Sequence, residues 1–402
     1  MATVTGGINV LDPDFYVDPW DGYRWLRDEA PVYWDPLQRL WAISRYDDVL
    51  EVERDTTRYS SHPGSRPHLD QSGDRSMINM DDPAHQAQRS LVSRRFTPRA
   101  VRSHEERVRA VVTQILDDIE PLGSCEAIDA IASRLPAMVI CDILGYPPEL
   151  WPKVRWWSER TMYLAGQTAP EGPPGDDRLP AIIDTAGGPI DDVIGDFVVS
   201  TLPVIAARRV DPRDDLISVW AQADGWDDGH VLEEVILVLD GGAETTRTVI
   251  GSMIHDLALD RDQRRLLIER PELLATTAVD EFIRWVSPVL NMRRTATEDH
   301  ELRGSHVREG DQLLLLYGSA NRDPRAFADP ERLDVAREHN RHVAFGFGTH
   351  FCLGAALARL EIRVMFEELL RRLPQWELVD PGGSRILPAS FARSFDRVPI
   401  RY

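Results

Sequence analysis

The chain has 402 residues, carries a formal net charge of −20 at pH 7 and contains three cysteines. Its negative charge argues against binding to nucleic acid or to an anionic membrane surface. Cys125, Cys141 and Cys352 are odd in number and suggest no disulfide framework, which is typical of a protein of the reducing cytoplasm.

The N-terminal part of the sequence shows no targeting or membrane segment. Residues 1–30 contain several aspartates and no apolar run, so we expect neither a signal peptide nor an anchor helix. No Gly/Ser-rich linker, charge block or repeat divides the sequence, so we expect a single domain over residues 1–402. Alternating apolar residues in 31–34 and 40–44 predict a short hairpin, and the Gly/Pro/Ser-rich segment 60–74 predicts a loop.

A helix is predicted to begin near residue 83, because Asp82 can cap it and Pro83 suits its first position. His85 and Arg89 lie four residues apart and therefore on one face of this helix. Two such donors suit a pair of carboxylates, although an ordinary exposed helix face has the same spacing. A basic stretch follows in an otherwise acidic chain, formed by Arg94, Arg95, Arg99 and Arg102, and the periodicity from residue 108 to about 144 predicts further helix.

The sequence from His230 to about Leu259 predicts one long helix with an unusual middle. There, residues 241–246 read Gly-Gly-Ala-Glu-Thr-Thr, which places two helix-destabilising glycines, an acid and two hydroxyls in an otherwise apolar segment. Paired glycines can simply permit close helix packing, and a threonine can bond the carbonyl four residues back. The same bond, from Thr245 to Gly241, could instead open a bulge in the helix at a reaction site.

Residues 345–354 form a glycine-punctuated loop that leads directly into a strongly periodic helix. Gly346 and Gly348 allow backbone conformations closed to other residues, so the loop can fold back and present the sulfur of Cys352 to a flat neighbour. Unpaired amides at the start of the following helix favour the thiolate form of this cysteine, which is the form that binds iron. A lone cysteine is more often a small buried hydrophobe, so the inference depends on the surrounding spacing.

That spacing, with Phe345, Gly348, Cys352 and Gly354 in the pattern Phe-x-x-Gly-x-x-x-Cys-x-Gly, resembles the haem-binding loop of the cytochrome P450 superfamily. The resemblance implies a mainly α fold with a small β region (α+β), in which a triangular helical domain is crossed by a long central helix. It implies a haem-thiolate monooxygenase with haem b as cofactor, acting on an apolar small molecule with O2. Two electrons would come from NAD(P)H through a ferredoxin and an NAD(P)H-dependent ferredoxin reductase, and we expect a cytoplasmic monomer.

The resemblance also implies roles for individual residues. Cys352 would be the iron ligand, and the haem propionates would bind His85, Arg89, Arg294 and His350. Phe345, Gly346, Gly354 and Gly241 would contact the cofactor. Glu244 would relay protons and Thr245 would hold the hydrogen-bond network that delivers them to dioxygen.

Two further sets follow from the resemblance. Glu281 and Arg284, with opposite charges three residues apart, would join Arg332 in a structural network behind the haem. Residues 151–184 would contribute the lid of the substrate channel, and the predicted substrate contacts are Leu237, Val289, Leu290, Met292 and Phe391.

The expected substrate class depends on the local sequence at residues 241–247 and 291–294. This sequence resembles that of actinobacterial members acting on steroids, terpenoids or branched lipids. Oxidative tailoring of a polyketide or peptide natural product is the alternative. A peroxide-driven haem-thiolate enzyme would need no redox partner, but such enzymes usually lack the pair formed here by Glu244 and Thr245. A non-catalytic haem or ligand-binding protein is the remaining interpretation.

Overall fold

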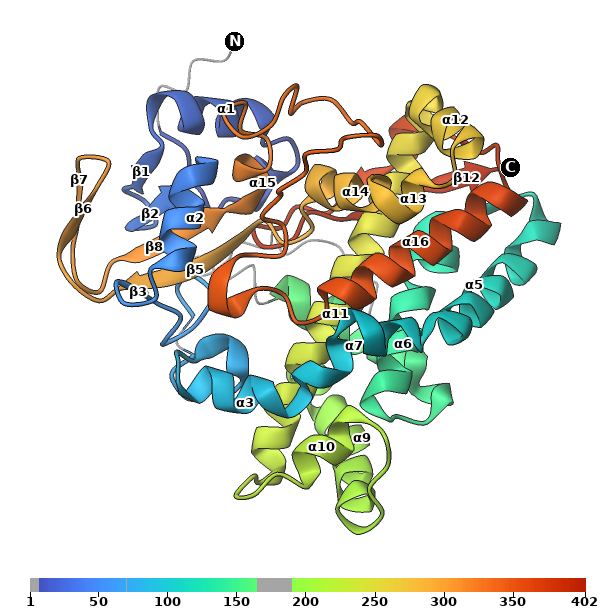
Figure 1. Ribbon diagram of the computed structural model, residues 1–402, viewed down its shortest axis with the longest axis horizontal. Helices are drawn as coiled ribbons and strands as arrows, with labels where there is room; N and C mark the ends of the chain where they lie inside the picture. Colours follow the sequence, from blue (N-terminus) through green and yellow to red (C-terminus); the bar gives the residue numbers. More distant parts are fainter. Residues whose placement is uncertain (1–6, 70, 165–189) are drawn as a thin grey trace.

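A computed structural model describes residues 7–69, 71–164 and 190–402 (Figure 1). The chain is mainly helical, with its largest sheet on one side of the molecule and its C-terminal strand on the other, so the predicted α+β class is confirmed. Most of the predicted lid, residues 165–184, lies outside the described residues. Among the residues described, no helix combines the length and the apolar character needed to cross a bilayer.

The longest helix, α11 (Asp228–Leu259), crosses the middle of the molecule, and α16 (Ala355–Arg372) lies against it (Figure 1). It begins two residues before the predicted start, because the side chain of Asp227 accepts a hydrogen bond from the backbone N–H of His230 and caps it. The other helices are α1 (Trp20–Glu29), α2 (Tyr46–Arg54), α3 (Ala84–Ser93), α4 (Pro98–Arg102), α5 (Glu105–Ile119), α6 (Arg134–Leu144), α7 (Trp151–Leu164), α9 (Ile190–Val210), α10 (Leu216–Ala221), α12 (Arg261–Glu269), α13 (Leu273–Thr276), α14 (Ala278–Val286) and α15 (Tyr317–Ala320).

The main sheet has five strands in the order β1 (Val32–Asp35), β2 (Leu40–Ile43), β8 (Gln312–Leu316), β5 (Asn291–Ala296) and β3 (Tyr59–Ser60). The predicted hairpin is confirmed, because β1 pairs antiparallel with β2. The smaller sheets comprise β4 (Ser124–Glu126) with β12 (Pro399–Arg401) and β9 (Glu377–Leu378), β6 (His300–Leu302) with β7 (Ser305–Val307), and β10 (Arg385–Ile386) with β11 (Phe395–Arg397).

The predicted helix from residue 108 to 144 is wrong in its middle. Helix α5 ends at Ile119, and Gly123 adopts a left-handed φ of 67°, which reverses the chain into strand β4. A π-helical turn at Ile128–Ala132 then leads into α6. Strand β4 is short and pairs with the C-terminal strand β12. Because this partner is remote in the chain, the local sequence does not reveal the strand.

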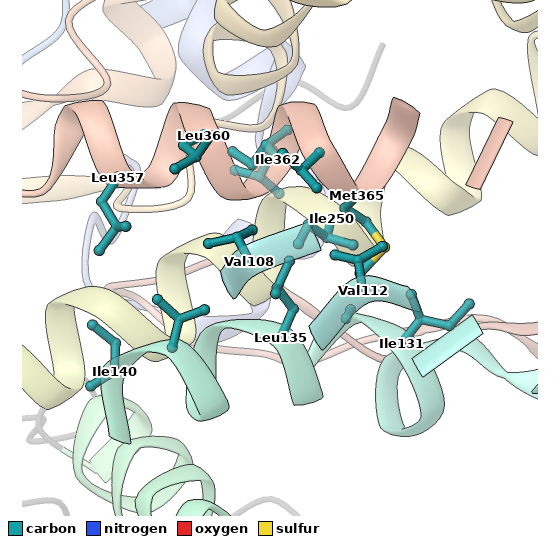
Figure 2. Packing of buried hydrophobic residues seen from close by; sticks show 14 of the residues in the cluster. Val108, Val112, Ile131, Leu135, Ile140, Ile250, Leu357, Leu360, Ile362 and Met365 are labelled. Atoms are coloured by element: carbon teal, nitrogen blue, oxygen red, sulfur yellow. The ribbon is translucent and has the colours of Figure 1, made fainter. Parts of the chain in front are cut away.

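The largest core cluster lies where α5, α6, α11 and α16 meet. Figure 2 shows Val108 and Val112 on α5 facing Leu360 and Met365 on α16, with Ile250 of α11 between the helices. All five side chains are buried. This packing fixes α16, and with it the loop that ends at residue 354, against the central helix.

The structural network around Glu281 differs from the prediction in one member. Arg284 donates two hydrogen bonds to the Glu281 carboxylate, at 2.7 and 2.8 Å, and both side chains are fully buried. The third cation is Arg337, whose Nε donates to Glu281 at 3.0 Å, and not Arg332. Arg332 is exposed, because it is the backbone carbonyl of this residue that turns inward and accepts from Arg284 and Arg337. The network ties α14 to the segment that precedes the cysteine loop.

Candidate active site

The loop before α16 folds as the glycine spacing predicts. Gly346 and Gly348 have left-handed φ values of 67° and 71°. The backbone N–H of Cys352 donates to the carbonyl of Phe345 at 2.9 Å, which closes the loop. A side chain at position 348 would meet the carbonyl oxygen of Glu53 at 2.8 Å, so the loop also packs tightly on helix α2. The sulfur-bearing residue is therefore held by its own loop and by a neighbouring helix.

The Cys352 thiol does not have the acidity that its place before a helix suggested. Burial raises the pKa of Cys352 above its usual value, although backbone N–H groups of Gly354 and Ala355 and the guanidinium groups of Arg89 and Arg359 act in the opposite direction. The helix start therefore does not by itself leave a thiolate here. A coordinating metal ion deprotonates a thiol outright, so a thiolate at this position requires its metal.

A cavity separates the cysteine loop from the central helix. Its floor includes Phe345, Gly346, Cys352 and Gly354, and its roof includes Gly241 and Thr245 of α11. A Cβ atom added to Gly241 or Gly354 would meet no atom within 4 Å, so both glycines leave open space on the two sides of the cavity. All of the cofactor contacts that were predicted from the sequence line this cavity.

Four nitrogen-bearing side chains line one part of the cavity wall: His85, Arg89, Arg294 and His350. The imidazole rings of His85 and His350 lie 4.1 Å apart, and the Nε2 atoms of both are buried without a hydrogen-bond partner. Burial, together with the nearby positive charges, lowers the pKa of His350 to about 3, so its ring is neutral. Buried polar atoms normally have partners, so two orphaned Nε2 atoms at a cavity wall fit a ligand that brings carboxylate oxygens.

Asp82 does not cap α3 as predicted. Its carboxylate instead lies 3.0 Å from Nδ1 of His85 and accepts a hydrogen bond from Thr349 at 2.9 Å. The interaction fixes the orientation of the His85 ring and connects helix α3 to the cysteine loop.

Glu53 and Tyr317 belong to the same wall, and the sequence reasoning missed both. Glu53 accepts a hydrogen bond from Nη2 of Arg294 at 2.7 Å and another from the Tyr317 hydroxyl, and all three side chains are buried. A signal was present, since Glu53 lies on the apolar face of α2, one and four residues after the buried Val52 and Val49. An acid at such a position needs a buried partner.

The middle of α11 combines the two interpretations left open by its sequence. Thr245 Oγ1 donates to the carbonyl of Gly241 at 2.7 Å, as predicted, yet the helix remains regular from Asp228 to Leu259. The expected bulge is therefore absent from this described helix. Gly242 serves packing, because a Cβ at this position would lie 2.3 Å from Cδ1 of Ile140 on α6, whereas the neighbouring Gly241 faces open space.

Glu244 does not line the cavity. Its carboxylate is 1% exposed and pairs with the guanidinium of Arg247, one turn further along α11. Arg247 also donates to Ser133 Oγ at 2.9 Å and to Ser394 Oγ at 3.1 Å. A buried ion pair therefore satisfies this acid without any catalytic role.

The predicted substrate contacts divide between two faces. On β5, Met292 and Arg294 point to the cavity, while the intervening Arg293 points away and donates to the Gly64 carbonyl at 2.8 Å. Leu237 and Val289 also line the cavity. Leu290 does not, because it packs into a separate core cluster with the N-terminal segment. Phe391 does not line the cavity either. It is buried in a cluster against which the cavity residues Val289 and Met292 pack.

Glu361 is a further buried acid that the sequence reasoning missed. It lies on α16 and lines the cavity together with Leu357 and Ala358 of the same helix. Its Oε2 atom has no hydrogen-bond partner, and burial raises the pKa of this carboxyl well above its usual range. Burial therefore disfavours the charged form of this carboxyl group beside the cavity.

Comparison with known proteins identifies the class to which this fold and cavity belong. A family model described as Cytochrome P450 matches residues 206–383. The steroid C26-monooxygenase of Mycobacterium tuberculosis is 38% identical over 401 residues, which cover 98% of this chain and 96% of that protein. The methyl-branched lipid omega-hydroxylase of Mycobacterium bovis is 37% identical over 408 residues, covering 96% and 91% of the two chains. The solved structure of Mycobacterium marinum cytochrome P450 CYP268A2 in complex with pseudoionone matches with a TM-score of 0.88 and 29% identity, over 99% of this chain and 100% of that one.

The chain therefore belongs to the cytochrome P450 family and is a monooxygenase with haem as its cofactor. The cavity fits that group. The Cys352 thiol lines it, Gly354 and Gly241 leave open space on its two sides, and orphaned imidazole nitrogens with two arginines line the wall where carboxylates would bind.

Proposed function

We propose that this P450 hydroxylates an apolar lipid, either a steroid or a lipid with a branched methyl terminus. The observation that carries the proposal is the apolar wall beside Thr245, formed by Leu237, Val238, Val289 and Met292. Two relatives that align over nearly the whole chain are named for a steroid and for a methyl-branched lipid. An apolar wall holds such a substrate by removing its surface from water.

The residue roles are part of the same proposal. Cys352 ligates the iron, while His85, Arg89, Arg294 and His350 hold the propionates, and Phe345, Gly346, Gly354 and Gly241 contact the ring. Bound haem supplies the activation of dioxygen and the transfer of one oxygen atom to the substrate.

Thr245 handles protons at its Oγ1 atom. Its hydrogen is directed to the Gly241 carbonyl, which leaves the oxygen lone pairs free to accept from water in the cavity. A relay through Glu244 would require its carboxylate to leave Arg247 first.

We further propose that electrons arrive from NAD(P)H through a ferredoxin reductase and a ferredoxin that docks beside the cysteine loop. Arg94, Arg99 and Arg102 are exposed, and within the described residues they form no ion pair. Phe347 and Phe351, which belong to the same loop as Cys352, are 38% and 41% exposed. A cationic face of this kind suits an acidic partner. A monomer in the cytoplasm is consistent with three free thiols at Cys125, Cys141 and Cys352.

The test is a spectral screen of the haem-loaded protein. The reduced carbon monoxide complex should absorb at the position typical of thiolate ligation, and Cys352→Ala should abolish that band. Steroids or branched lipids should then shift the Soret band and give hydroxylated products with ferredoxin, reductase and NADPH. A histidine-type carbon monoxide band would contradict the iron ligand, and unchanged spectra with every lipid would contradict the substrate class and favour a polyketide or peptide substrate.

The peroxide-driven alternative is distinguished by Thr245→Ala. If Thr245 handles protons, this variant should consume NADPH while forming much less product. Full turnover with hydrogen peroxide alone, unchanged in Thr245→Ala, would contradict the proposed role.

A further inference from the structure

Arg66 lies in the loop between β3 and α3, in an environment that is unusual for a charged side chain. Its guanidinium carbon is 3.0 Å from the centre of the Phe391 ring, and its Nη2 atom is 3.6 Å from the sulfur of Met162 on α7. Both neighbours are almost fully buried, at 4% and 3% exposed. The guanidinium is therefore enclosed by an aromatic face and a thioether, neither of which is a strong acceptor.

The guanidinium of Arg66 lacks a proper oxygen acceptor. Its Nη1 atom is buried and has no hydrogen-bond partner, and the one acid that acts on the guanidinium among the described residues, Asp240, does so without a hydrogen bond. Burial lowers the pKa of Arg66 to about 9, which still leaves the group charged at neutral pH. A buried cation with an unsatisfied N–H is costly unless a ligand completes it.

The nearest compensating charge is Asp240 on α11, which acts on Arg66 at a distance and not by contact. Asp240 instead accepts a hydrogen bond from Thr161 Oγ1 at 2.5 Å. Burial raises the pKa of Asp240 to about 7, so at neutral pH its negative charge is only partly developed. The pair thus retains a net positive charge on the side of Arg66.

This cluster lies directly behind the substrate wall. Phe391 and Met162 belong to a buried group against which Val289 and Met292 pack, and both of those residues line the cavity. On α11, Asp240 immediately precedes Gly241 and follows Leu237 and Val238, which also line the cavity. Arg66 itself does not line the cavity, so a lipid bound along this wall reaches the guanidinium only when Phe391 or Met162 moves aside.

We propose that Arg66 is an anchor for the anionic end of the substrate, so that the enzyme prefers lipids carrying a carboxylate at the end remote from the oxidised carbon. This inference rests on the proposed function, and it narrows the substrate class from apolar lipids to amphipathic acids. The carboxylate would accept from Nη1 of Arg66, while the chain lies along Val289 and Met292 towards the haem. Asp240 opposes the anion, so removing its charge should strengthen binding.

The experiment compares matched ligand pairs on the haem-loaded enzyme by calorimetry and by the Soret shift. The pairs are a long-chain fatty acid with its primary alcohol, and cholesterol hemisuccinate with cholesterol. The acid of each pair should bind more tightly than the neutral partner. Arg66→Met should weaken the acid by about ten- to a hundredfold, as expected for loss of a hydrogen bond to a charged group, and leave the alcohol unchanged. Asp240→Asn should tighten the acid, again without effect on the alcohol.

A matched control is Arg58→Met, in which a surface arginine paired with Glu298 and Asp55 is removed. It should bind both members of each pair as the native enzyme does, and Arg66→Lys should restore part of the preference. Equal loss for acid and alcohol in Arg66→Met would overturn the anchor and identify a packing role, while leaving the proposed function intact. If no member of either pair binds the native enzyme, the proposed function and the anchor both fail.

Discussion

The network at Glu281 yields a prediction that separates two arginines five residues apart. Glu281 accepts hydrogen bonds from Arg284, from Arg337, from Asn340 Nδ2 at 3.1 Å and from the backbone N–H of Asp334 at 2.9 Å. Arg337 is 9% exposed at its side chain and bridges this carboxylate to the carbonyls of residues 328, 329 and 332. Arg332 is exposed, and its guanidinium makes no hydrogen bond or ion pair among the described residues.

The expected magnitude follows from these contacts. Arg337→Ala removes one partner of a buried carboxylate and the arginine donor to the carbonyls of residues 328 and 329, which should cost about 3 to 5 kcal/mol of the free energy of unfolding. Arg332→Ala should change it by less than about 0.5 kcal/mol. With an unfolding entropy of about 2.1 cal/mol/K per residue over 402 residues, the two variants should lower Tm by about 4 to 6 °C and by less than about 1 °C.

The assay is thermal unfolding of the haem-loaded variants, followed by far-ultraviolet circular dichroism and by loss of the Soret band. Arg337→Lys serves as an intermediate, because lysine keeps the charge but cannot reach several acceptors at once. Equal losses in Arg337→Ala and Arg332→Ala, or a larger loss in Arg332→Ala, would refute the assignment of Arg337 as the third member.

Three further predictions concern other sites. Gly241→Ala should raise the stability by about 1 kcal/mol through helix propensity, whereas Gly242→Ala should lower it by about 1 to 3 kcal/mol because its Cβ overlaps α6; urea unfolding of both variants measures the difference. Met292→Ala should change the Soret titration by apolar ligands, and Leu290→Ala should instead lose about 2 to 5 kcal/mol of stability with ligand binding retained. Burial raises the pKa of Glu234 to about 7, so its folded form holds a proton more tightly than the unfolded chain, and this contribution to stability is present below pH 4.5 and lost as pH rises through 7. The free energy of unfolding of Glu234→Gln, relative to that of the native enzyme, should therefore rise by about 2 to 3 kcal/mol from pH 5 to pH 8. A relative stability that stays constant across that range would contradict the argument.

The cysteine loop and its donors could be predicted because their geometry is local. Two glycines and one cysteine within seven residues determine the loop, and the backbone hydrogen bond from Cys352 to Phe345 stays inside it. The His85 and Arg89 pair likewise needs only one helical turn. Elements of this kind are fixed by spacing, so the sequence predicted their place at the cavity.

The acids could not be predicted in the same way, because their partners are remote. Glu53 meets Arg294 across 241 residues and Tyr317 across 264. Arg332 was predicted for the network, but the direction in which the backbone turns brings the side chain of Arg337 to Glu281 instead. Long-range charge pairing therefore required the fold.

The middle of α11 shows that neighbouring residues of one motif can face different surroundings. Successive side chains on a helix point about 100° apart, so four consecutive residues must face different surroundings. Gly241 faces the cavity, Gly242 faces α6 and Glu244 faces Arg247, while Thr245 returns to the cavity one turn after Gly241. The acid and the alcohol are thus neighbours in sequence but not in environment, and any proton that passes from one to the other must cross from a buried ion pair to the cavity surface.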